Sequence, residues 1–156
     1  MSGKSWQQFE EVLPDLADVG RKLLYQDSDI ASAFLATVDG NNGPRLHPIF
    51  PVIAEGDLWL FIVNISLKYK DLVERGQFAL HSQPIKEGAE EFYIRGNVEL
   101  IEDTELKASI VAATDNRQGG SDFEALFRCR LLRILHTRWD GWGTSSAWPH
   151  YTKWRA

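Results

Sequence analysis

The chain has only one cysteine among its 156 residues, Cys129. A single thiol excludes an internal disulfide and a zinc site made of cysteine ligands. An unpaired thiol is typical of a reducing compartment, so we expect a cytoplasmic protein. Positive charge is also scarce, since 17 Lys and Arg residues stand against 22 Asp and Glu residues. Nucleic acids and anionic membranes attract basic surfaces, so neither is expected as a partner.

Long hydrophobic runs are lacking as well. The longest, residues 58–63, is far shorter than the ~20 residues that a transmembrane helix needs. The first residues, MSGKSWQQFEEVLP, contain no apolar core of signal-peptide length. The histidines lie on separate segments without metal-site spacing, so no metal is expected. With 44% hydrophobic and 25% charged residues, the chain is typical of a soluble globular protein, and we expect one domain over residues 1–156.

The N-terminal segment, residues 1–28, has the spacing of an amphipathic helix. Apolar residues recur at helical intervals from Phe9 to Leu24. Ser5 and Gln8 have the spacing of a capping box, and Pro14 lacks the amide proton that a continuous helix requires. The pattern predicts a helix over roughly residues 6–26 with a break near residue 14.

The middle of the chain reads as a series of short strands. Apolar and β-branched runs bounded by turn formers predict strands over residues 33–38, 45–54, 58–63, 78–82, 92–101 and 130–139. Gly96 marks a bulge in the fifth of them. Short helices are expected over residues 71–75, 104–114 and, for a single turn, 122–127, and residues 140–156 form a tail rich in Gly, Trp and Pro. Strands joined by such short turns predict a mainly β fold, a six-stranded antiparallel barrel with flanking helices.

The first candidate site lies where the third strand meets the next helix. Ser66, Lys68 and Lys70 follow closely after the apolar run 58–63. Free amide groups at a helix start favour an anion, and a hydroxyl and ammonium groups add donors and charge. This combination suits a phosphate. The alternative is a capped surface helix with solvated lysines.

The second candidate site lies on the preceding strand. Alternation puts Arg45, His47 and Ile49 on one face and Leu46 and Pro48 on the other. The guanidinium fork matches phosphate oxygens, whereas proline indicates an edge strand or an interrupted pairing. A solvent-facing arginine on an edge strand is the alternative.

The tail is the third unusual feature. Four of the six tryptophans lie in residues 139–156. Such large side chains bury against the same chain, a second subunit or a planar ligand.

The order of these segments resembles the flavin-binding split-barrel proteins of the pyridoxamine 5'-phosphate oxidase-like superfamily. The matching segments are, in order, AFLATV, DGNNGP, RLHPIFPV, DLWLFIVNISLK, DLVERGQFAL and FYIRGNVELI. They cover about half of the chain, between residues 33 and 101. The resemblance implies a homodimer of six-stranded split barrels with FMN at the subunit interface.

The resemblance also implies which residues bind FMN. Arg45 and Lys68 correspond to the cationic partners of the phosphate, with Ser66 and Leu67 beside them. The ring is expected to lie along the second and third strands, near a residue of the fifth strand and against a tryptophan of the partner chain. These positions are Leu46, His47, Pro48, Phe61, Ile62, Glu91 and Trp139.

Several residues depart from the oxidase pattern. Phe50 stands where the oxidase has a second cation, Leu67 replaces an arginine, and Glu91 replaces a glutamine. A carboxylate at Glu91 disfavours reduced, anionic flavin. The C-terminal residues GTSSAWPHYTKWRA lack the oxidase's substrate-binding arginine–histidine pattern, so pyridoxamine phosphate is not the expected substrate. Relatives in the superfamily also bind haem or the deazaflavin F420, and a fold does not choose among ligands.

The leading hypothesis is a cytoplasmic, homodimeric FMN oxidoreductase that acts on an unidentified small molecule or electron donor. No general acid or base is assigned, and His47 is a candidate hydrogen-bond donor to the ligand. The second hypothesis is a non-catalytic protein that binds or stores flavin, haem or F420. A split-barrel dimer without a ligand is the third.

Overall fold

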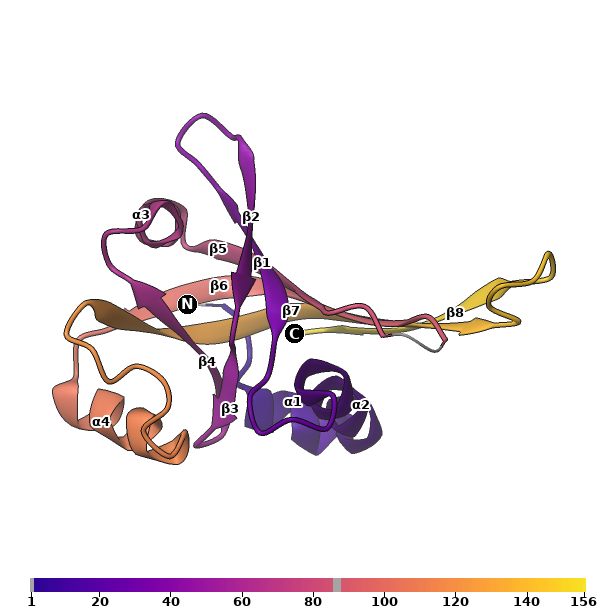
Figure 1. Ribbon diagram of the computed structural model, residues 1–156, viewed down its shortest axis with the longest axis horizontal. Coiled ribbons are helices and arrows are strands. Elements are labelled where there is room, and N and C mark those ends of the chain that lie inside the picture. The colour runs from indigo at the N-terminus through magenta and orange to yellow at the C-terminus, as the bar shows by residue number, and fades with distance from the viewer. Residues whose placement is uncertain (1, 86–87) are drawn as a thin grey trace.

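The computed structural model describes residues 2–85 and 88–156. Within these residues four helices and eight strands form (Figure 1). The helices are α1 (Trp6–Val12), α2 (Pro14–Tyr25), α3 (Leu67–Arg75) and α4 (Thr104–Ala113). The strands are β1 (Ala33–Val38), β2 (Pro44–Ile49), β3 (Val52–Ala54), β4 (Asp57–Val63), β5 (Gln77–Ser82), β6 (Glu90–Ile101), β7 (Glu124–Asp140) and β8 (Trp148–Arg155). None of the helices in the described ranges is long and apolar enough to span a membrane.

The strands form one antiparallel sheet that curls back on itself. Their order is β2-β1-β5-β6-β7-β4-β3, with β8 added alongside β7. The two ends of this order, β2 and β3, follow each other in the chain and are separated only by Phe50 and Pro51. The chain therefore links the two ends of the sheet covalently, while β2 and β3 are not paired with each other by backbone hydrogen bonds.

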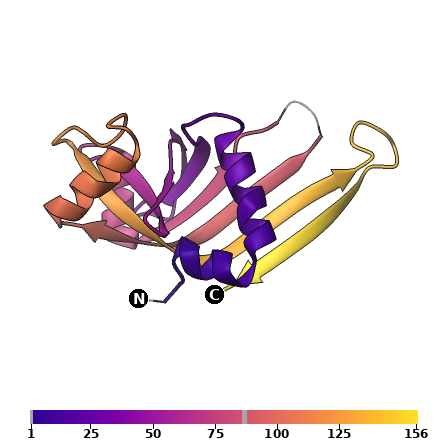
Figure 2. The ribbon, with the colours of Figure 1, turned by 90° about the horizontal axis from the view of Figure 1, so that it is seen from below.

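The barrel interior is filled by alternate residues of the strands. In β1 every second residue is buried, and Leu35 of that strand is inaccessible to solvent. Helices α1 and α2 lie across one end of the sheet and contribute Trp6 and Phe9 to the same core (Figure 2). Helix α4 covers a smaller cluster that contains Trp59, Phe61, Ile110 and Leu126, with Val52 at its side. The flanking helices thus close the barrel from two directions.

Several expectations from the sequence are confirmed in detail. The capping box of Ser5 and Gln8 is present, and the N-terminal helix divides at Leu13 so that Pro14 opens α2. Helix α4 lies within the expected range 104–114, and Asp103 caps it by accepting hydrogen bonds from two backbone amides. The register of β6 against β7 shifts between Arg95 and Gly96, which is the expected bulge.

Other expectations are wrong for identifiable reasons. The segment 45–54 is two strands, β2 and β3, because the chain bends at Phe50-Pro51. Helix α3 begins at Leu67, earlier than residue 71, because Ser66 caps it. Residues 124–127 begin β7 and are not helical, because they pair with β4. The tail adds β8. The six expected strands are therefore eight, one by division and one by addition.

The β7–β8 hairpin forms an arm, residues 133–155, that extends past the barrel (Figures 1 and 2). The first half of β7 pairs with β4 and its second half pairs with β8, while β6 follows its other edge. In the arm, Trp154 packs on Phe9 with 5.1 Å between ring centroids. This tryptophan therefore buries against its own chain.

We expect Gly96→Ala to lower the free energy of unfolding by about 2–3 kcal/mol, the upper range for overpacking. A Cβ at this position would lie 2.0 Å from the backbone oxygen of Arg130, which cannot rotate away. Urea titration followed by circular dichroism measures the change.

The matched control is Gly120→Ala, where a Cβ would meet nothing within 4 Å. This variant is expected to stay within about 0.5 kcal/mol of wild type. Equal stability of the two variants would contradict the close approach at the bulge.

Candidate functional site

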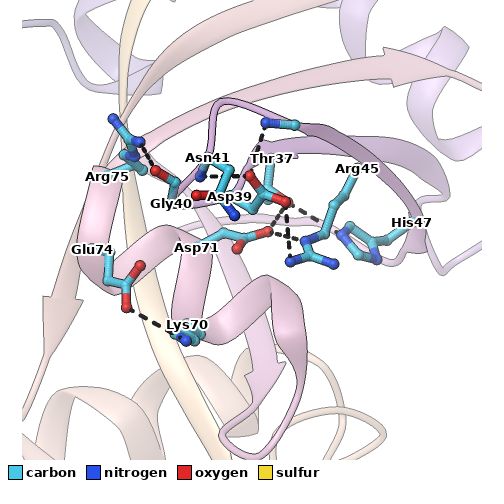
Figure 3. Close-up of polar contacts among 11 residues, drawn as sticks. Thr37, Asp39, Gly40, Asn41, Arg45, His47, Lys70, Asp71, Glu74 and Arg75 are labelled. Atoms are coloured by element: carbon cyan, nitrogen blue, oxygen red, sulfur yellow. Dashed lines mark hydrogen bonds and ion pairs between the residues drawn. The ribbon is translucent and has the colours of Figure 1, made fainter.

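A cluster of polar side chains joins β1, β2 and α3 on one side of the barrel (Figure 3). We call it the Arg45 cluster; its members are Thr37, Asp39, Arg45, His47 and Asp71. The cluster lies beside the N-terminal turn of α3, because α3 packs on β1. The two candidate sites of the sequence therefore belong to one region of the structure.

Strand register explains why Arg45 and His47 point the same way. Arg45 pairs with Thr37, and His47 pairs with Leu35. Thr37 and Leu35 are both buried, so this face of β1 and β2 points into the barrel. Leu46 and Pro48 are exposed on the opposite face. The alternation predicted from the sequence is confirmed.

Asp71 is the buried charge of the cluster, with a side chain only 2% exposed. Its Oδ2 atom lies 3.0 Å from Arg45 Nε and accepts a hydrogen bond of 2.7 Å from the Thr37 hydroxyl. The angle at Arg45 Nε does not satisfy a hydrogen bond, so this contact is an ion pair. A buried carboxylate needs such partners because its desolvation costs several kcal/mol.

Asp39 supplies a second negative charge to Arg45. Its Oδ2 lies 3.4 Å from Arg45 Nη2, and its Oδ1 accepts hydrogen bonds from the amides of Asn41 and Gly43. These backbone hydrogen bonds, with the nearby guanidinium of Arg45, lower the pKa of Asp39. The carboxylate therefore remains charged and holds both the turn and the arginine.

His47 stands between the cations and the buried carboxylate. Its Nε2 atom lies 3.2 Å from the Thr37 hydroxyl oxygen. Burial lowers the pKa of His47, and Lys68 and Arg45 lower it further, whereas Asp71 opposes them. The ring is therefore neutral near pH 7. Of the two cations of the predicted site, Arg45 lies in the cluster, and Lys68 at the start of α3 acts on His47 by its charge.

At the start of α3, the Ser66 hydroxyl differs from the expectation that it donates to an anion. Ser66 accepts a hydrogen bond from the amide of Tyr69, and its hydroxyl donates to the carbonyl of Val63 at 2.6 Å. Its one proton is therefore already used within the loop. Lys68 is half-buried, whereas Lys70 is exposed and lies 3.9 Å from Glu74. Lys68 is the better placed of the two lysines.

The remaining predicted site residues lie in different surroundings. Ile62 is fully buried in the barrel core, and Phe61 is buried against Gly119. Leu67 is exposed. Glu91 is exposed on β6, 3.9 Å from the ring of His81. A ligand at the Arg45 cluster would meet Ile62 only through its backbone.

Trp139 lies in the arm, and its ring centroid is 5.5 Å from that of Trp142. The arm projects away from β2 and α3 of the same chain (Figure 1). The structure therefore brings Arg45 and His47 together through Thr37 and Asp71, and Trp139 is separate from them within one chain.

Thr37, Asp39 and Asp71 were not singled out from the sequence. The available signal was Asp71, an acidic residue on the helix that follows Lys68. A carboxylate on the buried face of a helix requires a cation, and Arg45 was the nearby candidate. The signal was incomplete because the sequence alone does not show which face of α3 packs against the barrel.

A hollow of about 380 Å³ opens on the outer face of β1, β5 and β6. Its floor is formed by small residues, among them Ala36, Ala79 and Gly96, with Arg95 and Asn97 at its side. Ala36 pairs with Leu46, so the hollow adjoins the exposed face of β2. This outer face is concave and largely apolar.

Comparison with known proteins gives similarity at the level of structure. No family model and no curated protein sequence matches the chain. HutZ, described as the heme storage protein from Vibrio cholerae, has a TM-score of 0.60 and 17% identity, over 76% of this chain and 89% of its own. A NimC/NimA family protein from Clostridium acetobutylicum has a TM-score of 0.61 and 14% identity, over 94% of both chains.

ChuZ from Campylobacter jejuni is a further similar structure, with a TM-score of 0.65 and 14% identity, over 91% of this chain and 60% of its own. Identities this low carry information on the fold alone. These neighbours confirm the mainly antiparallel split barrel with flanking helices that the sequence predicted.

Proposed function

We propose that the protein belongs to the pyridoxamine 5'-phosphate oxidase-like superfamily and binds FMN at the Arg45 cluster. In this proposal it is an oxidoreductase that acts on an unidentified small molecule. The observation that carries it is that Arg45 of β2 is held against Asp71 of α3, the helix whose first turn contains Lys68. Two cations and the free amides of a helix start form a site for a phosphate.

Arg45 can bind an anion while its buried partners hold it. The contact with Asp71 uses Nε, and the contact with Asp39 uses Nη2. Within residues 2–85 and 88–156, Nη1 donates no hydrogen bond. Asp71 and Asp39 fix the guanidinium plane, and Lys68 supplies positive charge that has no ion pair in the same ranges. The phosphate would therefore meet an arginine that is already oriented.

The ring of the flavin would lie along β2. This strand ends the sheet order, so one edge of its backbone has no strand partner among the described residues. Backbone carbonyl groups alternate between the two edges of a strand, so this edge presents the carbonyls of alternate residues of the segment Leu46, His47 and Pro48. Those carbonyls can receive hydrogen bonds from a planar heterocycle. In this proposal the predicted ligand residues of β2 contact the ring through their backbone atoms.

The bound flavin would supply the hydride or electron transfer. The chain's own residues hold the phosphate, orient the ring and exclude water from it. No side chain of the Arg45 cluster is assigned as a general acid or base. The donor and the acceptor of electrons are small molecules.

A second candidate function is non-catalytic binding of haem, or of F420. It is favoured by two similar structures: HutZ, described as a heme storage protein, and a heme binding protein from Mycobacterium smegmatis. The absorption spectrum of the purified protein separates the candidates, because flavin gives a yellow band and haem gives a Soret band. Anaerobic bleaching of a bound flavin by NADH or NADPH would then distinguish a reductase from a store.

The exposed apolar residues support a homodimer. Leu46, Phe50, Ile65 and Leu67 of β2 and the start of α3 are all more than half exposed. Monomeric proteins rarely expose apolar side chains in such a group, and an interface covers them. In the dimer, Trp139 on the arm of one subunit would contact the ligand of the other.

We expect Arg45→Ala combined with Lys68→Ala to weaken FMN binding at least ~100-fold, because two charge-assisted contacts to the phosphate are lost. Isothermal titration or fluorescence quenching of FMN gives the Kd. Affinity for riboflavin, which lacks the phosphate, should fall much less. Circular dichroism must show that the variant is folded, because Asp71 loses its Arg45 partner. Lys70→Ala is the control and should leave both affinities near wild type.

Equal weakening of FMN and riboflavin would show that the two cations do not act on the phosphate. A wild-type protein that binds neither ligand, and is colourless when purified, would overturn the FMN proposal itself.

We expect Phe50→Asp to weaken dimerisation at least ~10-fold, because a charge would enter the apolar interface. Phe50 is 57% exposed in the single chain, so the monomer itself should remain folded. Sedimentation equilibrium measures the dimer dissociation constant, and circular dichroism checks the fold. Val12→Asp, at a similarly exposed apolar residue of α1, is the control that should dimerise like wild type. Equal dimerisation of both variants would contradict this interface.

A further inference from the structure

The hydrogen bonds around Thr37 determine which nitrogen of His47 carries the proton. A threonine hydroxyl has one proton, and Thr37 donates it to Asp71 Oδ2 at 2.7 Å. The Asp71 carboxylate, paired with Arg45, can only accept. The contact of 3.2 Å between Thr37 Oγ1 and His47 Nε2 must therefore have Nε2 as its donor. The proton of the neutral ring lies on Nε2.

The other ring nitrogen, Nδ1, is consequently an acceptor. Among residues 2–85 and 88–156, no side chain or backbone group forms a hydrogen bond with it. It is also absent from the buried polar atoms that lack a partner, so Nδ1 reaches solvent from the half-buried ring. This lone pair is open to a ligand.

The neutral form of His47 is the relevant one near pH 7. The charged groups around the ring are Lys68 and Asp71 from α3, Arg45 from its own strand and Asp39 from the turn after β1. Burial and the two cations lower the pKa of His47 against the opposing effect of Asp71. The ring therefore loses its Nδ1 acceptor only as the pH falls below the ordinary value of 6.5.

We propose that His47 Nδ1 selects the ligand by accepting a hydrogen bond from a hydroxyl group that lies next to the ligand's phosphate. Such a hydroxyl belongs to a phosphorylated polyol chain, of which the ribityl phosphate of FMN is an example. This inference rests on the proposed function and names the specificity residue of that site.

The geometry of β2 supports the match. Two residues along a strand span ~6.6 Å, and Arg45 and His47 lie on one face of β2, so both can contact one phosphorylated polyol chain. An ionised carboxylate, such as a haem propionate, only accepts hydrogen bonds and cannot pair with the lone pair of Nδ1. At this atom the acceptor therefore distinguishes a hydroxyl donor from a carboxylate.

The tautomer is tested first, without any ligand. Two-bond ¹H–¹⁵N correlation spectra of ¹⁵N-histidine protein should show His47 protonated at Nε2 alone. Thr37→Val removes the acceptor and should release this preference, whereas Thr37→Ser should retain it. A wild-type ring protonated at Nδ1 would overturn the inference, whatever the variants do.

The selectivity is tested with two flavins, FMN and an analogue whose phosphate is carried by an unhydroxylated pentyl chain. The ratio of the analogue Kd to the FMN Kd should be about 10-fold larger for wild type than for His47→Phe, since the variant loses one hydrogen bond to FMN. Affinity for the analogue should be similar in both proteins. The preference of wild type should fall as the pH is lowered through the pKa of His47, and that of His47→Phe should not.

Each result has one meaning. An unchanged preference in His47→Phe, with FMN still bound tightly by both proteins, would overturn the role of His47 and leave the proposed function intact. A wild-type protein that binds neither flavin would overturn the proposed function instead.

Discussion

The site depends on one buried carboxylate. Asp71 is almost inaccessible to solvent, and it contacts Arg45 of β2 and Thr37 of β1 from helix α3. Three elements are thereby fixed relative to one another by groups that cannot separate without leaving a charge unpaired. The same contacts orient the guanidinium of Arg45 and, through Thr37, the ring of His47. The contacts of Asp71 therefore both stabilise the packing of α3 on β1 and β2 and orient the side chains of the site.

The buried pair also limits the charge that the site offers. Arg45 faces the carboxylates of Asp71 and Asp39, so its positive charge is largely balanced before a ligand arrives. Lys68 and the amides of the α3 N-terminus carry most of the uncompensated attraction. The absence of a cation at Phe50 and at Leu67 agrees with this balance. Recognition in such a site relies on geometry and hydrogen bonding as much as on net charge.

The fold itself does not choose the ligand. The similar structures include a heme storage protein and a NimC/NimA family protein on the same architecture, at 14–17% identity. Function resides in the side chains that each chain places on that barrel. For this chain, the distinguishing set is His47 with its Thr37–Asp71 support, beside Arg45. The proposed function assigns to that set a ligand with a phosphate and neighbouring hydroxyl donors.

Local sequence determined the helix caps at Ser5 and Asp103, the bulge at Gly96 and the alternation that places Arg45 and His47 on one face of β2. These features depend on neighbouring residues, whose chemistry is visible in the sequence. The strand made by the tail and the partners of Arg45 were decided only by the tertiary structure. They depend on pairing between distant segments: a tail becomes a strand when β7 offers a free edge, and a helical aspartate becomes a site residue when barrel closure buries it.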